Sequence, residues 1–296
     1  MTTPLVSVVI PTYNHAQYLP IALESVQSQT MGDWEAIVID NYSSASTVDI
    51  VSSISDERIR LVQFANNGVI AASRNHGISL TAAPYVAFLD SDDSWRPEKL
   101  ELVMARLKRG ADLVCHGETW VGPGERRRIV KYGPAERSSY DGLLFGGNSI
   151  STSAVVVDRK RLIEAGGFDE DPLVTTAEDY DLWLKLASNG TRMVFMDEIL
   201  GEYLIHAEGQ SRSPLRNMKA VMAVFERHIA MQGATIATSS RAQRRRGTIY
   251  YSGGRSLQAV GEFAPAWEYY FRSIRLNPTR PQTWAAMLLN ALRVRL

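Results

Sequence analysis

The sequence predicts an α/β fold with a mostly parallel sheet and helices on both of its faces. Two observations indicate it: short β-branched runs recur through the first third of the chain, and a segment with helical spacing follows each of them. Alternating strands and helices of this length specify a sheet of that kind. The predicted strands are residues 5–10, 34–39, 58–64 and 85–89, and the predicted helices are residues 16–29, 68–80 and a segment that starts at residue 47.

The rest of the chain predicts a second half of this fold and then a helical region. The stretch 122–140, which holds Gly, Pro and three consecutive arginines, is typical of a hairpin or a loop. Further strands are expected at 112–121, 148–157, 193–196 and 199–205, and further helices between 94 and 112, at 158–168, from 175, and at 214–232, 241–259, 262–276 and 280–295. The predicted domains are therefore residues 1–212 and a helical region at 213–296.

The composition narrows the class of protein. A chain that is 45% hydrophobic and 22% charged is typical of a globular protein, and 32 basic against 32 acidic residues give no global field that would attract nucleic acid. The single cysteine, Cys115, excludes an intrachain disulfide and fits a reducing compartment. No secretory signal and no run of about 18 apolar residues is present, so we expect a cytoplasmic protein, with peripheral contact at the inner face of the membrane left open. No pattern indicates an oligomeric state.

An apolar run ends abruptly at three carboxylates, Asp90, Asp92 and Asp93. Like charges this close raise one another's pKa unless a cation lies between them. The alternative is a turn that caps the following helix, since Asp92 or Asp93 could accept bonds from free N–H groups near Pro97. This stretch alone leaves both interpretations open.

Two other loops favour a ligand site. The loops that begin at Pro11, Asp40 and Asp90 follow the first, second and fourth predicted strands, and each opens with polar groups. In a parallel sheet the carboxyl ends of the strands share one edge, where ligands bind. Convergence of three polar loops at that edge is hard to explain by helix capping alone.

A set of short motifs, taken in order, resembles the family 2 glycosyltransferases of the GT-A fold, a Rossmann-like sheet. They are Val6–Asn14, Asp40–Ser44, Asn67-Gly68, Arg74–Gly77, Leu89–Trp95, Gly166–Glu170, Glu178–Trp183 and Tyr203–His206. Asn41, Tyr42 and Ala45 depart from the Asp, Gly and Asp that are common in the family. The resemblance covers residues 5 to about 211, and it implies a nucleotide-binding half at 1–112 and an acceptor-side half at 113–212.

The resemblance also implies the chemistry of a metal-dependent, inverting transfer from a nucleotide-diphosphate sugar, with a UDP-sugar as the expected donor. Mn²⁺ or Mg²⁺ is the expected cofactor, because hard oxygen ligands suit both ions. Asp92 would bind the metal directly, and Asp90 would bind the ribose, or the metal through water. Asp93 would serve as a second ligand or as a helix cap, and His206 would close the metal or diphosphate site.

Nucleotide-binding residues follow from the same resemblance. They are Pro11, Thr12, Tyr13, Asn14, Asp40, Arg74, Asp90 and Ser91. Tyr13 would stack on the base and Asp40 would accept from the uracil ring nitrogen. Arg74 would bind the nucleotide or phosphate, a use that suits its fixed fork of donors, and its alternative is a helix surface residue.

An inverting transfer needs a carboxylate that takes the proton from the acceptor hydroxyl. The resemblance assigns this role to Asp179, next to Glu178. The alternative is structural, because Thr175-Thr176-Ala177-Glu178 matches a capping box and either carboxylate could cap a helix. The acceptor would be a glycan, a glycolipid or another hydroxyl compound.

Several other residues have structural explanations. Trp183 falls on a buried helix face and could also border an acceptor pocket, with Asn148 as a second acceptor candidate. His15, His76 and His116 are interpreted as structural. The arginines at 241 and 244–246, with Tyr250 and Tyr251, could face anionic lipid or a polymer, or form a solvated helix face.

Two other functions remain as alternatives. A nucleotidyltransferase would share the sheet and the metal carboxylates, but it normally has a Gly-rich basic loop after the first strand, where this chain has Pro11 to His15. A non-catalytic nucleotide-sugar-binding module, with a helical tail that recruits a partner, would need no acidic residues in three loops.

Overall fold

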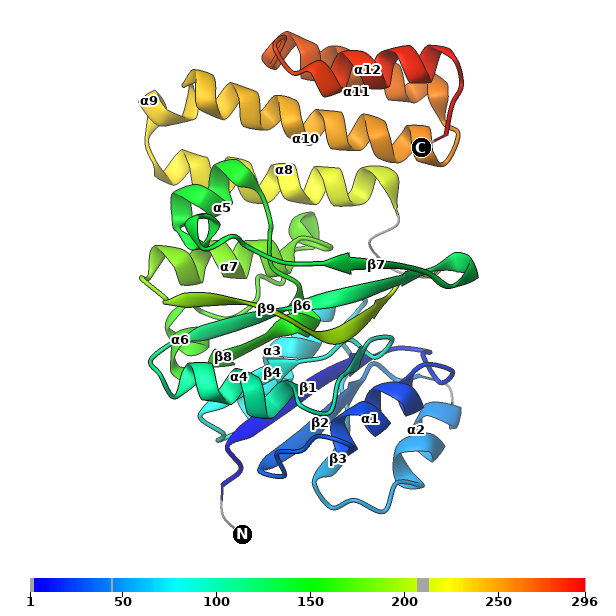
Figure 1. The fold of residues 1–296 in the computed structure, drawn as a ribbon, viewed down its shortest axis with the longest axis vertical. Coiled ribbons are helices and arrows are strands. Elements are labelled where there is room, and N and C mark those ends of the chain that lie inside the picture. Colours follow the sequence, from blue (N-terminus) through cyan, green and yellow to red (C-terminus); the bar gives the residue numbers. More distant parts are fainter. Residues whose placement is uncertain (1–2, 44, 207–212, 296) are drawn as a thin grey trace. The chain divides into compact units, whose positions relative to one another are not determined.

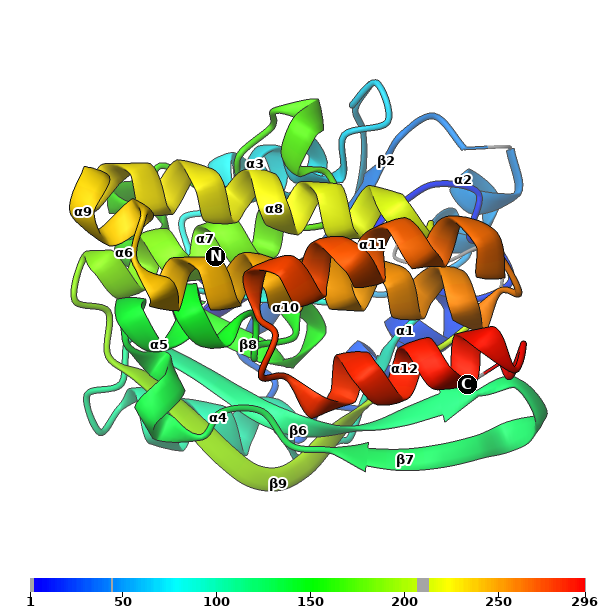
Figure 2. The same cartoon turned by 90° about the horizontal axis from the view of Figure 1, so that it is seen from above.

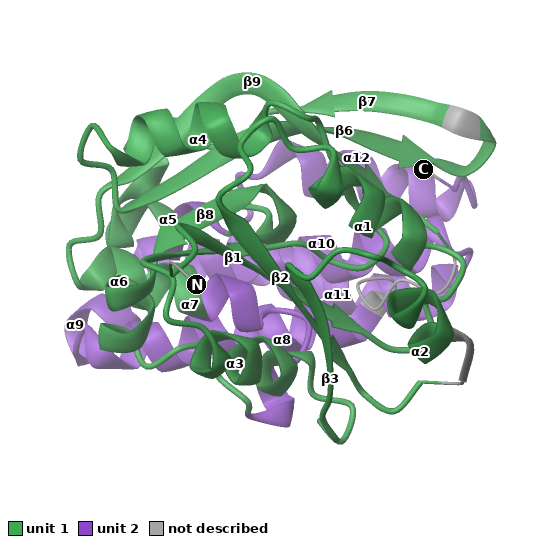
Figure 3. Cartoon of the chain, turned by 90° about the horizontal axis from the view of Figure 1, so that it is seen from below, with its two compact units in different colours: residues 1–143, 148–170, 182–207 green, residues 144–147, 171–181, 208–296 purple. Residues whose placement is uncertain are grey.

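The computed structural model describes residues 3–43, 45–206 and 213–295. The chain forms two compact units, shown in different colours in Figure 3. Unit 1 comprises residues 1–143, 148–170 and 182–207, and unit 2 comprises residues 144–147, 171–181 and 208–296. The segments 144–147 and 171–181 belong to unit 2, although they precede the predicted start of the helical region at residue 213.

The first half of unit 1 is the parallel sheet that the sequence predicts. Its strands are β1 (Val6–Thr12), β2 (Trp34–Asp40), β3 (Ile59–Gln63) and β4 (Tyr85–Phe88). They lie in the order β3-β2-β1-β4, and all three pairings are parallel. Because Thr12 is the register partner of Asp40, the loops after β1 and β2 leave the sheet side by side.

The other half of the sheet is mixed. After β4 come β8 (Val155–Asp158), β6 (Leu113–Gly122), β9 (Met193–Leu204) and β5 (Ser94–Trp95), and β7 (Arg126–Val130) forms a hairpin with β6. Two predictions need correction. The strands expected at 193–196 and 199–205 are one strand, whose pairing with β6 shifts in register near Gly117. The strand expected at 148–157 begins only at Val155, because Thr152–Ala154 forms a 3₁₀ turn (η3).

Helices cover both faces of the parallel strands (Figure 1). In unit 1 they are α1 (Leu19–Gln27), α2 (Ala45–Ser52), α3 (Ile70–Leu80), α4 (Lys99–Leu107) and α6 (Arg159–Glu164). Val8 lies in one buried cluster with Leu23 of α1 and Val103 of α4. Val9 points to the opposite face, where α3 packs so closely that a Cβ on Gly77 would lie 2.5 Å from the Val9 side chain. This alternation is the side-chain period of a strand.

Unit 2 is helical among the residues described. Its helices are α8 (Pro214–Met231), α9 (Ala234–Ala237), α10 (Ser240–Ala259), α11 (Phe263–Leu276) and α12 (Pro281–Ala291). The axes of the long helices α8, α10 and α11 are roughly aligned in Figure 2. The 3₁₀ turn η4 (Pro172–Val174) also belongs to unit 2. Helices α5 (Tyr140–Gly146) and α7 (Glu178–Ser188) contribute residues to both units. Gly254 of α10 lets α11 approach, since a Cβ there would lie 2.6 Å from the Tyr270 ring. Among the described residues, none of the helices has the length and apolarity to cross a membrane.

Candidate active site

The site lies in unit 1, at the carboxyl ends of β1, β2 and β4. Asp40 ends β2 and is fully buried, and both of its carboxylate oxygens accept from the Ser43 backbone N–H, at 3.1 and 3.2 Å. The Ser43 hydroxyl in turn accepts from the backbone N–H of Asn14, at 2.8 Å, so the loops after β1 and β2 are tied together. Asn14 has φ 54°, a left-handed conformation that Asn tolerates better than most residues.

Beside this junction the predicted base-binding residues differ in exposure. Pro11 and Thr12 are buried at the end of β1, whereas the Tyr13 side chain is 55% exposed. The exposed Tyr13 ring offers a face for stacking, whereas the buried Asp40 carboxylate is engaged by the Ser43 N–H and by the Gln63 side chain. The roles of Tyr13 and Asp40 in base recognition therefore stay predictions.

Arg74 and Asp90 form an ion pair across this edge. Nη2 of Arg74 donates to Oδ1 of Asp90 at 2.7 Å, and the arginine is 3% exposed although it belongs to helix α3. Its guanidinium also lies 5.3 Å from the centre of the Phe168 ring. The surface-residue alternative for Arg74 is therefore wrong: its charge is directed to the loop after β4.

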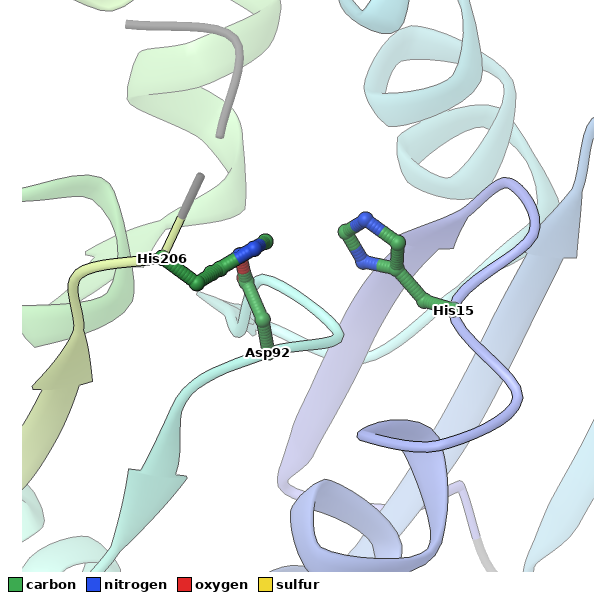
Figure 4. Close-up of side chains that lie close together, drawn as sticks. All are labelled: His15, Asp92 and His206. Carbon is green, nitrogen blue, oxygen red and sulfur yellow. The ribbon is translucent and has the colours of Figure 1, made fainter. Parts of the chain in front are cut away.

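Asp92, His206 and His15 converge at this loop (Figure 4). Nε2 of His206, just past the end of β9, lies 2.7 Å from Oδ2 of Asp92. Nδ1 of His15, in the loop after β1, lies 2.9 Å from the hydroxyl of the buried Ser91. One ligand atom from each of Asp92, His206 and His15 lies within 4.8 Å of the others.

These three side chains fit a divalent metal. Nδ1 of His206 is buried and has no hydrogen-bond partner among the described residues, so the ring has donor or acceptor capacity that the protein does not use. A carboxylate with two imidazoles is a mixed oxygen and nitrogen donor set, which suits Mn²⁺ better than the harder Mg²⁺. The sequence interpretation gave His15 a structural role only. Its position after β1, at the same edge as Asp92, is the signal that could have found it.

Asp93 is a buried link between three segments. Oδ2 accepts from the Ser153 hydroxyl at 2.5 Å, and Oδ1 accepts from the Leu204 backbone N–H at 3.0 Å. The Ser153 hydroxyl also accepts from the backbone N–H of Asp90, at 3.1 Å. Burial raises the pKa of Asp93 well above its usual value, and the charges of Asp92, Glu118 and Asp90 raise it further. Both carboxylate oxygens are thus engaged with protein donors, and its role as a metal ligand stays a prediction.

A second buried carboxylate, Glu118 of β6, lies behind the site. It accepts from the Tyr132 hydroxyl and, at 3.3 Å, from the Ser151 hydroxyl. Burial raises the pKa of Glu118 to about 7, and the Asp90 charge adds to the increase. The sequence interpretation missed Glu118, because one acidic residue in a strand gives no signal of its surroundings.

The predicted catalytic carboxylates lie in unit 2, at the start of α7. Oε2 of Glu178 accepts from the Thr176 backbone N–H at 2.8 Å, whereas the predicted capping box pairs Glu178 with Thr175. Oδ1 of Asp179 accepts from the Tyr180 backbone N–H at 2.7 Å. Thr176 has φ 81°, and its carbonyl accepts from the Asn217 side chain at 2.9 Å. Unit 1 holds the metal candidates and unit 2 holds the base candidate, so the role of Asp179 stays a prediction.

The two acceptor candidates differ in their surroundings. Trp183 is fully buried and makes an edge contact with Phe168, at 6.5 Å between ring centres. Asn148 is exposed, and its Oδ1 accepts from the Ile150 backbone N–H at 3.1 Å. The structural roles expected for two histidines fit their contacts, since His76 stacks on Phe64 and burial lowers the pKa of His116 to about 3.

The fold is that of the GT-A glycosyltransferases, and the comparisons place the chain in a family. The profile described as "Glycosyl transferase family group 2" matches residues 85–292, and that of "Glycosyl transferase family 2" matches residues 7–153. TuaG of Bacillus subtilis, a glycosyltransferase assigned to teichuronic acid biosynthesis, is 33% identical over 75% of this chain and 87% of its own length. The chain belongs to glycosyltransferase family 2.

Solved structures with this fold include nucleotide-sugar complexes. TarS of S. aureus with UDP-GlcNAc superposes with a TM-score of 0.62 at 18% identity, over 96% of this chain and 88% of that one. The mannosyltransferase PcManGT of Pyrobaculum calidifontis with GDP-Man and Mn²⁺ gives 0.61 at 17% identity, over 99% and 86%. The chain spans only 22% to 30% of the bacterial chondroitin and hyaluronan synthases that it also matches.

Proposed function

We propose that this glycosyltransferase uses a divalent metal, preferably Mn²⁺, to transfer a sugar from a UDP-linked donor to an acceptor hydroxyl with inversion at the anomeric carbon. The observation that carries the proposal is the convergence of Asp92, His206 and His15 beside the Arg74–Asp90 pair. TuaG is assigned to polysaccharide synthesis, and we extend that role to this chain. TarS binds UDP-GlcNAc and PcManGT binds GDP-Man with Mn²⁺, which supports a nucleotide-sugar donor and a metal.

Most side chains of the proposed donor site are already held in position by the protein. Tyr13 would stack on the base, and the buried Asp40 carboxylate would accept from its ring N–H. Arg74 already orients the Asp90 carboxylate, and the Ser153 hydroxyl holds the Asp90 backbone N–H. The remaining lone pairs of the carboxylate can therefore accept from a ribose hydroxyl. These groups are held before the donor arrives, which lowers the entropic cost of binding.

Asp92 and His206 would hold the metal, with His15 as a third ligand. When bound, the ion would neutralise the charge that grows on the diphosphate as the sugar leaves. Asp92 and His206 already lie in contact, Oδ2 to Nε2 at 2.7 Å, so both side chains would be available to hold the ion. Ser91 keeps His15 oriented through its hydroxyl.

Asp179 would accept the proton of the acceptor hydroxyl. The acceptor oxygen forms a bond to the anomeric carbon while the bond from that carbon to the diphosphate breaks, so the electron pair leaves with the diphosphate. Attack from the face opposite the diphosphate inverts the configuration. The Tyr180 backbone N–H donates to Oδ1 of Asp179 and so orients the carboxylate.

The test is turnover of a panel of UDP- and GDP-sugars with Mn²⁺ or with a chelator. Donor hydrolysis, with water as acceptor, avoids the need for the natural acceptor, and proton NMR identifies the first-formed anomer. We expect hydrolysis of a UDP-sugar only with Mn²⁺, and an inverted anomer. Asp179→Asn should lower kcat by about 10²-fold or more while UDP binding is unchanged. A retained anomer, or full turnover by Asp179→Asn, would overturn the mechanism.

A further inference from the structure

Helix α12 of unit 2 buries polar side chains and exposes large apolar ones, the reverse of what is usual for a helix in water. Thr283 and Asn290 are 0% and 1% exposed, whereas Trp284 and Leu288 are 53% and 64% exposed. Leu292, one residue past the helix, is 66% exposed. These three apolar residues recur every fourth position, so they lie along one face, the apolar stripe. α12 carries no charged residue in its whole length.

The orientation of this helix is fixed by hydrogen bonds. The Thr283 and Ser273 hydroxyls lie 3.2 Å apart, and Nδ2 of Asn290 donates to the Phe263 carbonyl at 2.9 Å. Rotating α12 to bury the apolar stripe would leave these buried polar groups without partners, which is unfavourable. The apolar stripe is thus held outward by the fold. Exposed single leucines are ordinary, but a directed row is typical of a docking surface.

A basic groove adjoins the apolar stripe. The start of α10 and the end of α11 enclose a groove of about 560 Å³, lined by Ser240, Gln243, Arg244, Arg275, Leu276, Asn277, Pro278 and Thr279. Both arginines are exposed, and none of these described lining residues is acidic. The Trp284 indole N–H donates to the Pro278 carbonyl at 2.9 Å, so the apolar stripe begins at the rim of the groove.

The net charge of this region is strongly positive. Residues 213–295 carry Arg or Lys at thirteen positions and Glu at three, although the whole chain is balanced. The three arginines at 244–246 differ in burial and in partners. Arg245 is buried and Arg246 pairs with Glu226 at 2.6 Å, which leaves Arg244 at the groove. A second copy that docked through this same region would bring the same positive charge to the surface and would be repelled.

We propose that unit 2 binds the surface of an anionic phospholipid membrane. The apolar stripe enters the boundary between headgroups and acyl chains, where Trp is favoured, and Arg244 and Arg275 contact headgroup phosphates. Each basic side chain near such a surface adds to the attraction, which weakens with salt. The proposal goes beyond sugar transfer and does not depend on it.

Sedimentation of the full chain with vesicles tests the proposal. We expect binding to vesicles made of equal parts phosphatidylcholine and phosphatidylglycerol, and much weaker binding to phosphatidylcholine alone or at high salt. The triple change Trp284→Ser, Leu288→Ser and Leu292→Ser should weaken binding by at least about tenfold. The double change Arg244→Gln and Arg275→Gln should weaken it by about three- to tenfold.

Matched controls come from helix α8 of the same unit. Met231 is 67% exposed, and Arg216 and Lys219 are also exposed, so Met231→Ser and the double change Arg216→Gln, Lys219→Gln should bind as wild type. Circular dichroism establishes that each variant is folded. Equal binding by the triple variant and by Met231→Ser would overturn the proposal. So would a dimer in light scattering that only the triple variant loses, or pyrophosphate binding that needs Arg244 and Arg275 while vesicles are not bound.

Discussion

Nε2 of His206 lies 2.7 Å from Oδ2 of Asp92, although 114 positions separate the two residues in the sequence. The contact joins the end of β9 to the loop after β4, and the His15 ring faces it from the loop after β1 (Figure 4). Each side chain comes from a different strand end, so the sheet itself assembles the site.

The two histidines should contribute unequally to metal binding. We expect His206→Ala to weaken Mn²⁺ binding in the presence of UDP by about 10- to 100-fold, because it removes the imidazole that contacts Asp92. His15→Ala should weaken it less, because the ring is also held by Ser91. Electron paramagnetic resonance of free Mn²⁺ measures both affinities without turnover. His76→Ala, at a ring stacked on Phe64, is the control and should bind Mn²⁺ as wild type.

The Arg74–Asp90 pair should matter for stability. Arg74→Met leaves the Asp90 carboxylate without its charged donor, and we expect the free energy of unfolding to fall by about 1.5–3 kcal/mol. Arg58→Met is the control, since Arg58 pairs with Asp56 at 2.8 Å but its side chain is 40% exposed, and it should cost about 1 kcal/mol or less. Urea unfolding measures both, and equal losses would show that burial of the pair is unimportant.

Asp93 should tolerate an amide but not truncation. Asp93→Ala leaves the Leu204 N–H and the Ser153 hydroxyl without an acceptor, and we expect a loss of about 2–5 kcal/mol in the free energy of unfolding. Asp93→Asn keeps one acceptor for Leu204 and places its amide against the Ser153 oxygen, so the loss should stay within about 1 kcal/mol. If Asp93→Asn keeps its stability and also loses Mn²⁺ binding, Asp93 is a metal ligand, as the sequence suggested.

Glu118 should make stability depend on pH. Burial raises its pKa from the usual 4.5 to about 7, so ionisation is costlier in the folded chain than in the unfolded one. The contribution of protonated Glu118 to the free energy of unfolding is complete below pH 4.5 and is lost as the pH rises through 7. We expect the wild type to lose on the order of 3 kcal/mol relative to Glu118→Gln between pH 4.5 and pH 8. Urea unfolding across this range measures the difference, and parallel stability curves would contradict the prediction.

Much of the fold follows from local pattern, because the strands at the sheet centre are β-branched runs and the carboxylates that end them are visible in the sequence. The sequence could therefore predict that Asp90 and Asp92 lie together at the carboxyl edge of the parallel sheet. The role of His15 could not, since its neighbours Ser91 and His206 come from distant segments. The two-residue strand β5 and the outward face of α12 also depend on tertiary partners, the first on β9 and the second on α11.

Calorimetric titration of UDP tests the central claim, that Asp92 joins a metal to the nucleotide. We predict that wild-type protein binds UDP at least about tenfold more tightly with Mn²⁺ than with a chelator. Asp92→Asn should bind UDP in Mn²⁺ only as well as the wild type does without metal. Equal wild-type affinity with and without Mn²⁺, or a metal-dependent gain that Asp92→Asn retains, would contradict the account.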